Sequence, residues 1–269
     1  MSKAKGARQA NVPGAVFLCP LGFGRSLLFF GLPTLAAVFC FYVLMPALIE
    51  GGVLPFYAHS IALIIPLAGL LLAALLAYRL EGNPFTWPAL AARFRWRRMD
   101  GRAWLWTLGI WVLQIGIWFL LQRLSSWLIV EGIMHVPQNL PAFVDPRNAV
   151  TGAVYDQAAG GLQGNWGFVI TSLALLFFNI AGEELWWRGY ILPRQELAFG
   201  KWAWLVHGLL WTAFHAFKWW DLLSLLPLCL GLSYVVSRLK NNTPGLVMHT
   251  LQKADFFLVV VPLFLYGGQ

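Results

Sequence analysis

Apolar residues form long runs along this chain, and short polar segments separate them. A helix needs about 20 mostly apolar residues to cross a bilayer. The pattern predicts seven such spans, at about residues 26–49, 57–80, 104–130, 166–184, 202–219, 222–236 and 243–266. An eighth helix would fit in the connector 188–201 or in the polar stretch 131–165. We therefore expect an all-α fold, a polytopic transmembrane bundle of seven or eight spans.

Composition agrees with this pattern. Hydrophobic residues make up 59% of the chain and charged residues 11%, whereas soluble domains carry about 25% charged residues. The three cysteines are scattered and show no CxxC spacing, so they indicate neither a disulfide framework nor a thiolate zinc site. The net charge of +8 comes from basic residues beside the spans, which favours a membrane surface over nucleic acid as the partner.

The basic segments also predict the topology. Lysine and arginine concentrate in loops on the cytoplasmic side of a membrane. We expect residues 1–25 to be a cytoplasmic N-terminal tail, and residues 26–164 to hold the first spans with a basic cytoplasmic loop and an extracytoplasmic loop. The expected location is the cell (inner) membrane, with the C-terminus outside.

One basic segment allows two interpretations. Five arginines alternate with aromatic residues between the second and third spans, namely Arg93, Arg95, Arg97, Arg98 and Arg102. They are typical of an interfacial amphipathic helix that binds anionic headgroups. They equally fit the plain excess of positive charge that marks a cytoplasmic loop.

Ionisable residues inside apolar spans are the candidates for chemistry, because burying such a group in a bilayer costs about 2.5–3.5 kcal/mol on insertion scales. Glu183 ends the fourth span, and His215 and His249 lie in two later spans. If the chain reverses near Gly200, Glu183 and His215 come to nearly the same depth, since they lie at similar distances along two antiparallel helices. We expect His249 in the same layer, on the cytoplasmic side.

A buried glutamate beside histidine suits the activation of water. The carboxylate can take a proton from water and return it, and a second imidazole can donate to a developing oxyanion. The same three side chains, Glu183, His215 and His249, would also form a ligand set known for catalytic zinc. No HExxH motif is present, so no cofactor is certain and a divalent metal such as zinc stays an alternative.

Three motifs in order carry a family resemblance. Glu183-Glu184 is followed by Arg188, then comes Trp211 four residues before His215, and His249 lies in the last span. Over about residues 165–260 this pattern resembles the CPBP family of CAAX-processing and bacteriocin-processing intramembrane proteases, also called the ABI family.

The resemblance implies glutamate-dependent peptide hydrolysis by a catalytic core at residues 165–269. Glu183 would be the base that activates water and His215 would assist it, while His249 would stabilise the oxyanion. Glu184 and Arg188 would be structural or orienting, as a salt bridge across one helical turn.

The last motif departs from the family pattern. The family usually has asparagine four residues after this histidine, where the present chain has Lys253, preceded by Gln252. Gln252 would supply an amide donor one position away, and Lys253 a cationic donor. Trp211 also replaces the commoner phenylalanine of the second motif.

The motifs together predict an intramembrane endopeptidase. Its partners would be the lipid bilayer and a membrane-anchored or secreted protein or peptide, cut at a membrane-proximal bond. Lys253 motivates an alternative from another class, a catalytically inactive membrane scaffold or immunity protein. A third interpretation is a transporter with a Glu–His proton relay, but the chain shows no inverted halves.

Overall fold

The computed structural model describes residues 18–149, 151–253 and 261–266 of the 269-residue chain. These residues form helices and no strand. Four helical stretches are long and apolar enough to cross a membrane, namely Phe23–Glu50, Pro55–Leu80, Gly101–Val130 and Trp166–Leu239. The predicted all-α transmembrane bundle is therefore confirmed. The division of the chain at residues 25 and 164 stays a prediction.

The first two spans form an antiparallel pair. The first comprises α1 (Phe23–Phe39), a π-helical segment (Cys40–Leu44) and α2 (Met45–Glu50), and the second is α3 (Pro55–Leu80). Gly52 has a φ of 89° in the turn between them, a conformation that glycine adopts without a steric penalty. Pro55 stands at the start of α3, where its missing N–H leaves no hydrogen bond unmade.

The arginine-rich segment does not form the amphipathic helix that was one of its two interpretations. Helix α4 (Trp87–Arg93) ends at Arg93, and Arg95 has a φ of 58°, which no α-helix allows. Helix α5 (Gly101–Val130) begins only after Asp100, whose Oδ1 accepts a hydrogen bond from the Ala103 backbone N–H at 2.7 Å.

The fourth to sixth predicted spans lie in one helical stretch. It contains α7 (Trp166–Glu183), a π-helical segment (Glu184–Ile191), α8 (Leu192–Phe199), α9 (Ala203–Phe214), a 3-10 segment (His215–Asp221) and α10 (Leu222–Leu239). The chain reverses between α8 and α9 at Gly200, which has a φ of 56°. The predicted hairpin near Gly200 is confirmed.

The seventh predicted span is wrong as a continuous helix. Helix α11 (Thr243–Gln252) ends at Gln252, and the Lys253 N–H bonds to the Thr250 carbonyl in a turn. The apolar run contains two charged residues here, Lys253 and Asp255. Residues 254–260 lie outside the described part of the chain, and α12 (Val261–Tyr266) follows. The polar stretch before α7 contains α6 (Gly152–Ala159), which is too short to be a span.

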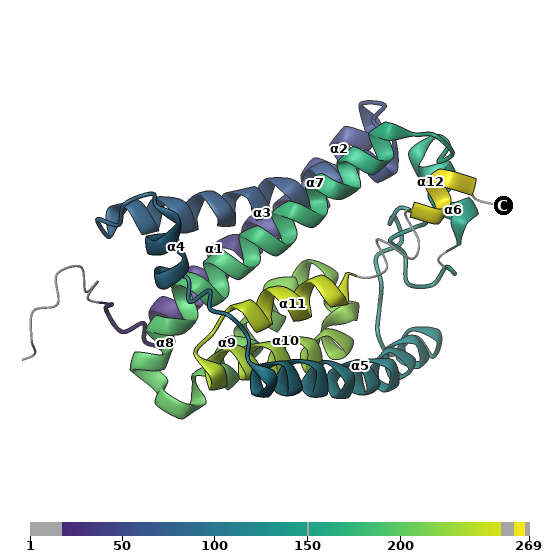
Figure 1. Cartoon of the computed structure of the whole chain (residues 1–269). Helices are drawn as coiled ribbons and strands as arrows, with labels where there is room; N and C mark the ends of the chain where they lie inside the picture. Colours follow the sequence, from purple (N-terminus) through teal and green to yellow (C-terminus); the bar gives the residue numbers. More distant parts are fainter. Residues whose placement is uncertain (1–17, 150, 254–260, 267–269) are drawn as a thin grey trace, which may run out of the picture.

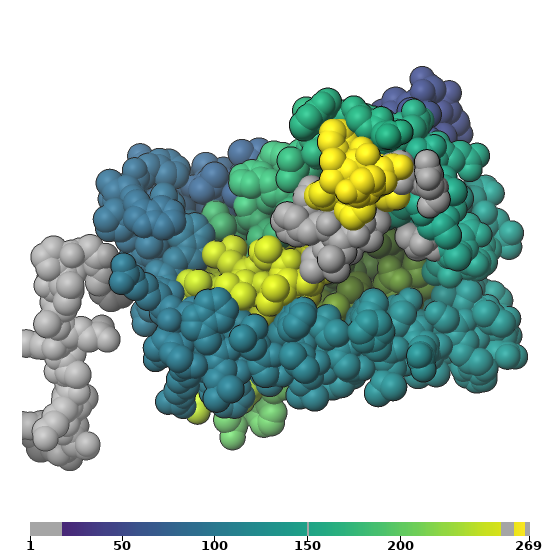
Figure 2. Space-filling view, turned by 45° about the vertical axis from the view of Figure 1, so that its right-hand side comes forward, coloured from purple at the N-terminus to yellow at the C-terminus, as the bar shows by residue number. Residues whose placement is uncertain are grey.

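The helices surround α11 on several sides. In Figure 1, α1, α3 and α7 run together, α5 lies on the other side, and α9, α10 and α11 lie between them. Helix α10 packs against both α5 and α9, while α3 packs along α7. The space-filling view in Figure 2 shows α11, in yellow-green, between α5 and the helices drawn above it. The end of α7 and the N-terminal part of α11 are thus brought together.

Candidate functional site

Glu183 and Glu184 lie where α7 passes into its π-helical continuation. Both side chains are buried, with exposed fractions of 1% and 0%. Consecutive residues of a helix point about 100° apart, because one turn takes about 3.6 residues. The two carboxylates therefore face different neighbours.

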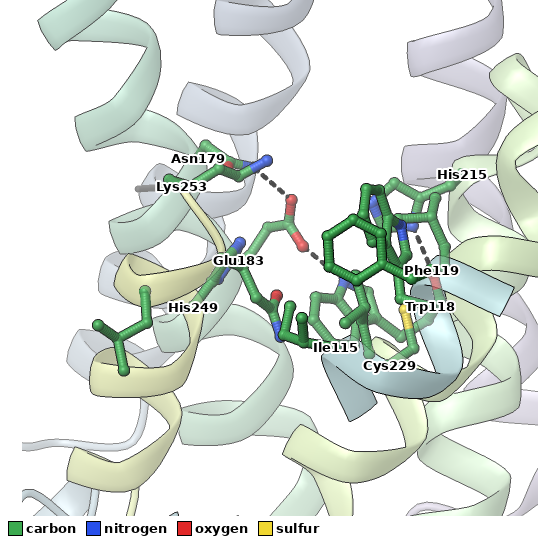
Figure 3. Close-up of a pocket in the computed structure, with 14 residues that line it drawn as sticks. Ile115, Trp118, Phe119, Asn179, Glu183, His215, Cys229, His249 and Lys253 are labelled. Carbon is green, nitrogen blue, oxygen red and sulfur yellow. Dashed lines mark hydrogen bonds between the residues drawn. The ribbon is translucent and has the colours of Figure 1, made fainter. Parts of the chain in front are cut away.

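Glu183 is held by two uncharged donors. Asn179 Nδ2 donates to its Oε1 at 2.7 Å, and Trp211 Nε1 donates to its Oε2 at 2.5 Å. Figure 3 shows the hydrogen bond between Asn179 and the carboxylate of Glu183. The two bonds fix its orientation and add no positive charge to it.

Glu184 is held by an arginine and by a histidine, which is ionisable. Its Oε1 lies 2.9 Å from His249 Nδ1 and 3.3 Å from Arg188 Nη1. The predicted ion pair between Glu184 and Arg188 is present. The Arg188 guanidinium also lies 3.3 Å from the centre of the Trp211 ring, a cation–π contact, so Trp211 contacts both Glu183 and a partner of Glu184.

Outside side chains support the π-helical segment. Arg93 Nη1 donates to the Gly189 carbonyl at 2.8 Å, and Asn242 Nδ2 donates to the Glu184 carbonyl at 3.1 Å. Gly245 allows α11 to approach, since a Cβ there would lie 2.7 Å from Glu184 Oε2. π-Helical turns are often found at functional sites.

Glu183, His215 and His249 line one cavity of about 320 Å³. Gln252 and Lys253 line the same cavity. The fold thus brings five of the predicted site residues together. The other two, Glu184 and Arg188, do not line it and lie behind its wall, where both are fully buried.

The hydrogen bonds of the two histidines assign their tautomers. His215 Nδ1 lies 2.9 Å from the Trp211 carbonyl oxygen, and His249 Nδ1 lies 2.9 Å from the Glu184 carboxylate. Both partners accept, so each Nδ1 carries a proton. The Nε2 atom of each imidazole is left for the cavity that both rings line.

The metal alternative at Glu183, His215 and His249 stays a prediction. Within the described residues, no group of three histidine, cysteine, aspartate or glutamate side chains is arranged to hold a metal ion. No step proposed below passes through a metal.

Gln252 and Lys253, the residues at which the last motif differs from the family pattern, lie in the cavity wall. Gln252 Nε2 is buried and has no hydrogen-bond partner within the described chain, so this donor is available to a ligand. Lys253 also lines a second cavity of about 100 Å³, together with Glu183 and His215. In Figure 3, Lys253 lies near Asn179 and Glu183.

Sequence reasoning missed Asn179 and the apolar residues that line the site. Asn179 was not considered, although a polar residue one turn before Glu183 in an apolar span is itself a signal. The predicted catalytic core begins at residue 165, yet α5 also lines the cavity, with Ile115, Trp118 and Phe119. No pattern marks these three, because α5 is apolar along most of its length.

Comparison with known families agrees with the site. Residues 165–254 match the family model described as type II CAAX prenyl endopeptidase Rce1-like. The match supports the resemblance of this part of the chain to the CPBP family. No curated protein and no solved structure matches the chain. The CPBP match covers Glu183, His215, His249 and the motif residues between and beside them, and it supports peptidase activity at the level of the family.

Proposed function

We propose that the chain is an intramembrane endopeptidase of the CPBP type, in which Glu183 activates the attacking water. One observation carries the proposal. Glu183 is a buried carboxylate that faces a cavity, and its two hydrogen-bond donors are neutral. Arg188 forms an ion pair with Glu184 instead, and His249 forms a hydrogen bond with Glu184. A carboxylate held in this way keeps its capacity to accept a proton.

Each residue of the cavity has its own role in the proposed reaction. Water lies between Glu183 and the substrate, gives its proton to the Glu183 carboxylate and attacks the peptide carbonyl carbon. His215, oriented through its Nδ1–H, accepts a hydrogen bond from this water at Nε2. The C–N bond then breaks, and the proton held by Glu183 passes to the leaving nitrogen.

The oxyanion is stabilised from α11. His249 lines the cavity and would donate from Nε2 once a proton reaches that atom, and Gln252 Nε2 is a buried donor at the same cavity. Lys253 supplies a positive charge where the family usually has an asparagine. In this proposal Lys253 replaces the neutral amide donor of the family asparagine, and the oxyanion site is kept.

The walls of the cavity favour a substrate segment at the membrane. Helix α5 contributes Ile115, Trp118 and Phe119, and its outer surface carries exposed apolar side chains. We propose a membrane-anchored or secreted protein as substrate, cut at a membrane-proximal bond, with the enzyme in the cell membrane and its N-terminus in the cytoplasm. The family match makes a prenylated C-terminal CAAX sequence the first probe.

Substitution of Glu183 tests the proposal. The full chain in lipid vesicles is assayed with an internally quenched, farnesylated CAAX peptide and by profiling of new peptide termini in membranes. Loss of the base in E183Q should lower the rate by about 10²–10⁴-fold. E131Q, at an exposed glutamate after α5, is the matched control and should retain the wild-type rate.

Two results would overturn the proposal. Wild-type cleavage by E183Q would remove Glu183 from the mechanism. Absence of any new termini with the wild-type chain, together with an unchanged cellular phenotype for E183Q, would favour the non-hydrolytic scaffold. Cleavage of membrane proteins without cleavage of the farnesylated probe would exclude only this probe as substrate.

A further inference from the structure

A second polar cavity lies apart from the Glu183 site. It has a volume of about 350 Å³ and shares no lining residue with the cavity around Glu183. Four arginines from two separate segments line it, namely Arg97, Arg98, Arg102 and Arg238. Asp100 is the acidic residue in its wall, and its Oδ1 caps α5.

These arginines differ from the other basic residues nearby. Arg93 pairs with Glu81 at 2.6 Å, and Arg95 pairs with Glu196 at 2.8 Å. The four arginines of the cavity have no ion pair within the described chain, and all four side chains are exposed. Like charges that converge without counter-ions repel one another, so the cavity favours an anion.

The backbone around the cavity is held in place. The Arg97 N–H bonds to Asn241 Oδ1 at 3.2 Å, and the Arg97 carbonyl accepts from Thr243 Oγ1 at 2.8 Å. The Asn242 N–H also bonds to the Arg95 carbonyl at 2.8 Å. The loop before α5 is thus attached to the turn before α11, which fixes the distance between Arg97 and the end of α10.

The position along α5 indicates where the anion comes from. Trp104 and Leu105 follow Arg102 directly and are 44% and 74% exposed, so the apolar outer surface of α5 begins beside the cavity. Tryptophan and arginine at the end of a span are typical of the headgroup layer. The cavity therefore lies at the depth of lipid phosphates.

We propose that this cavity binds a phosphate group, supplied by the headgroup of an anionic phospholipid. Guanidinium groups form paired hydrogen bonds with phosphate oxygens, and four of them can surround one or two phosphates. The site is independent of the hydrolytic reaction. It explains why four of the basic residues remain unpaired while their neighbours form ion pairs.

Lipid binding by the full chain in neutral detergent tests the proposal. Native mass spectrometry counts bound phosphatidylglycerol and phosphatidylcholine, and thermal unfolding measures the stabilisation by each lipid and by inorganic phosphate. R98Q/R238Q removes one charge from each of the two segments. Binding of phosphatidylglycerol should weaken by about thirtyfold, on the scale expected for two basic residues at a headgroup.

R25Q/K201Q is the matched control. It removes two exposed basic charges outside the cavity, and it should bind phosphatidylglycerol as the wild type does. Equal weakening in both double variants would show a general surface effect and overturn the site, as would unchanged binding in R98Q/R238Q. Stabilisation by inorganic phosphate alone, lost in R98Q/R238Q, would keep the anion site and overturn the lipid as its source.

Discussion

Glu183 and Glu184 are neighbours in the sequence, are equally buried, and have opposite surroundings. Glu183 faces a cavity and bonds to the neutral donors Asn179 and Trp211. Glu184 faces the protein interior and bonds to Arg188 and His249. Glu183 has no ion pair with Arg or Lys within the described chain, whereas Glu184 pairs with Arg188. The difference suggests that one carboxylate does chemistry and that its neighbour holds the site together.

The largest expected effect on stability belongs to Glu184. E184Q leaves the fully buried Arg188 without its anionic partner, and breaking a buried pair in this way typically costs about 3–5 kcal/mol. We expect a strongly lowered unfolding temperature in detergent. E183Q should keep the wild-type temperature, because Asn179 Oδ1 is without a partner and an amide flip would satisfy the new amide group.

The double variant E184Q/R188M separates lost charge pairing from lost packing. Removing both charges should recover much of the stability, since a buried pair replaced by neutral groups is often close to neutral in free energy. If E184Q/R188M is as unstable as E184Q, the Glu184–Arg188 ion pair is not what stabilises this region.

The next effect concerns His249. The sequence groups it with Glu183 and His215, whereas the structure bonds its Nδ1 to Glu184. A double-mutant cycle on stability with E184Q and H249A should give a coupling energy of about 1.5–3 kcal/mol, as for a hydrogen bond to a charged group. The corresponding cycle with E183Q and H249A should give a smaller value. If the coupling energy between His249 and Glu183 were larger than that between His249 and Glu184, His249 would belong with Glu183.

Trp211 contacts Glu183 through its N–H and Arg188 through its ring, so these two contacts can be tested separately. W211F keeps an aromatic ring for Arg188 and removes the N–H that bonds to Glu183. We expect near wild-type stability and a loss of roughly tenfold in kcat/KM, within the range for one hydrogen bond to a charged group.

W204F is the control for this change. Trp204 lies on the same helix, and its ring contacts Tyr234. It should cleave as the wild type does. A W211F variant that is unstable but fully active per folded molecule would assign Trp211 to packing alone.

The smallest effect is expected in the loop before α6. Arg147 Nη2 and Nε donate to the two carboxylate oxygens of Asp145 at 2.6 and 2.8 Å, and this pairing holds the pKa of Asp145 below its usual range. Its contribution to stability is present above the unfolded pKa of about 3.9 and is lost as the pH falls through the lower folded value.

Thermal unfolding from neutral to acidic pH compares wild type with D145N. The variant should be slightly less stable at neutral pH, and the difference should disappear at the acidic end. Its rate of hydrolysis should be unchanged, in contrast to E183Q. A difference that persists in acid would mean that Asp145 acts through something other than its charge.

Much of the bundle could be predicted because long apolar runs predict membrane-spanning helices directly. The reversal at Gly200 could also be placed, and this placement brought Glu183 and His215 to one depth. The same reasoning failed at α11, where Lys253 ends a helix inside a run that is otherwise apolar. At the arginine-rich segment the sequence left two interpretations open, and the amphipathic helix is excluded because α4 ends at Arg93 while Arg93 and Arg95 form internal ion pairs.

The sequence by itself determined the class of the fold, the residues that stand in apolar spans, and their depth, since all three follow from hydropathy and the rise per residue of a helix. Only the tertiary structure decided in which direction each of these side chains points. Which carboxylate receives His249, which arginines remain unpaired, and which face of α5 closes the cavity depend on helix rotation and packing. Those are set by contacts between segments far apart in the chain, such as Asn242 with Glu184 and Trp211 with Glu183.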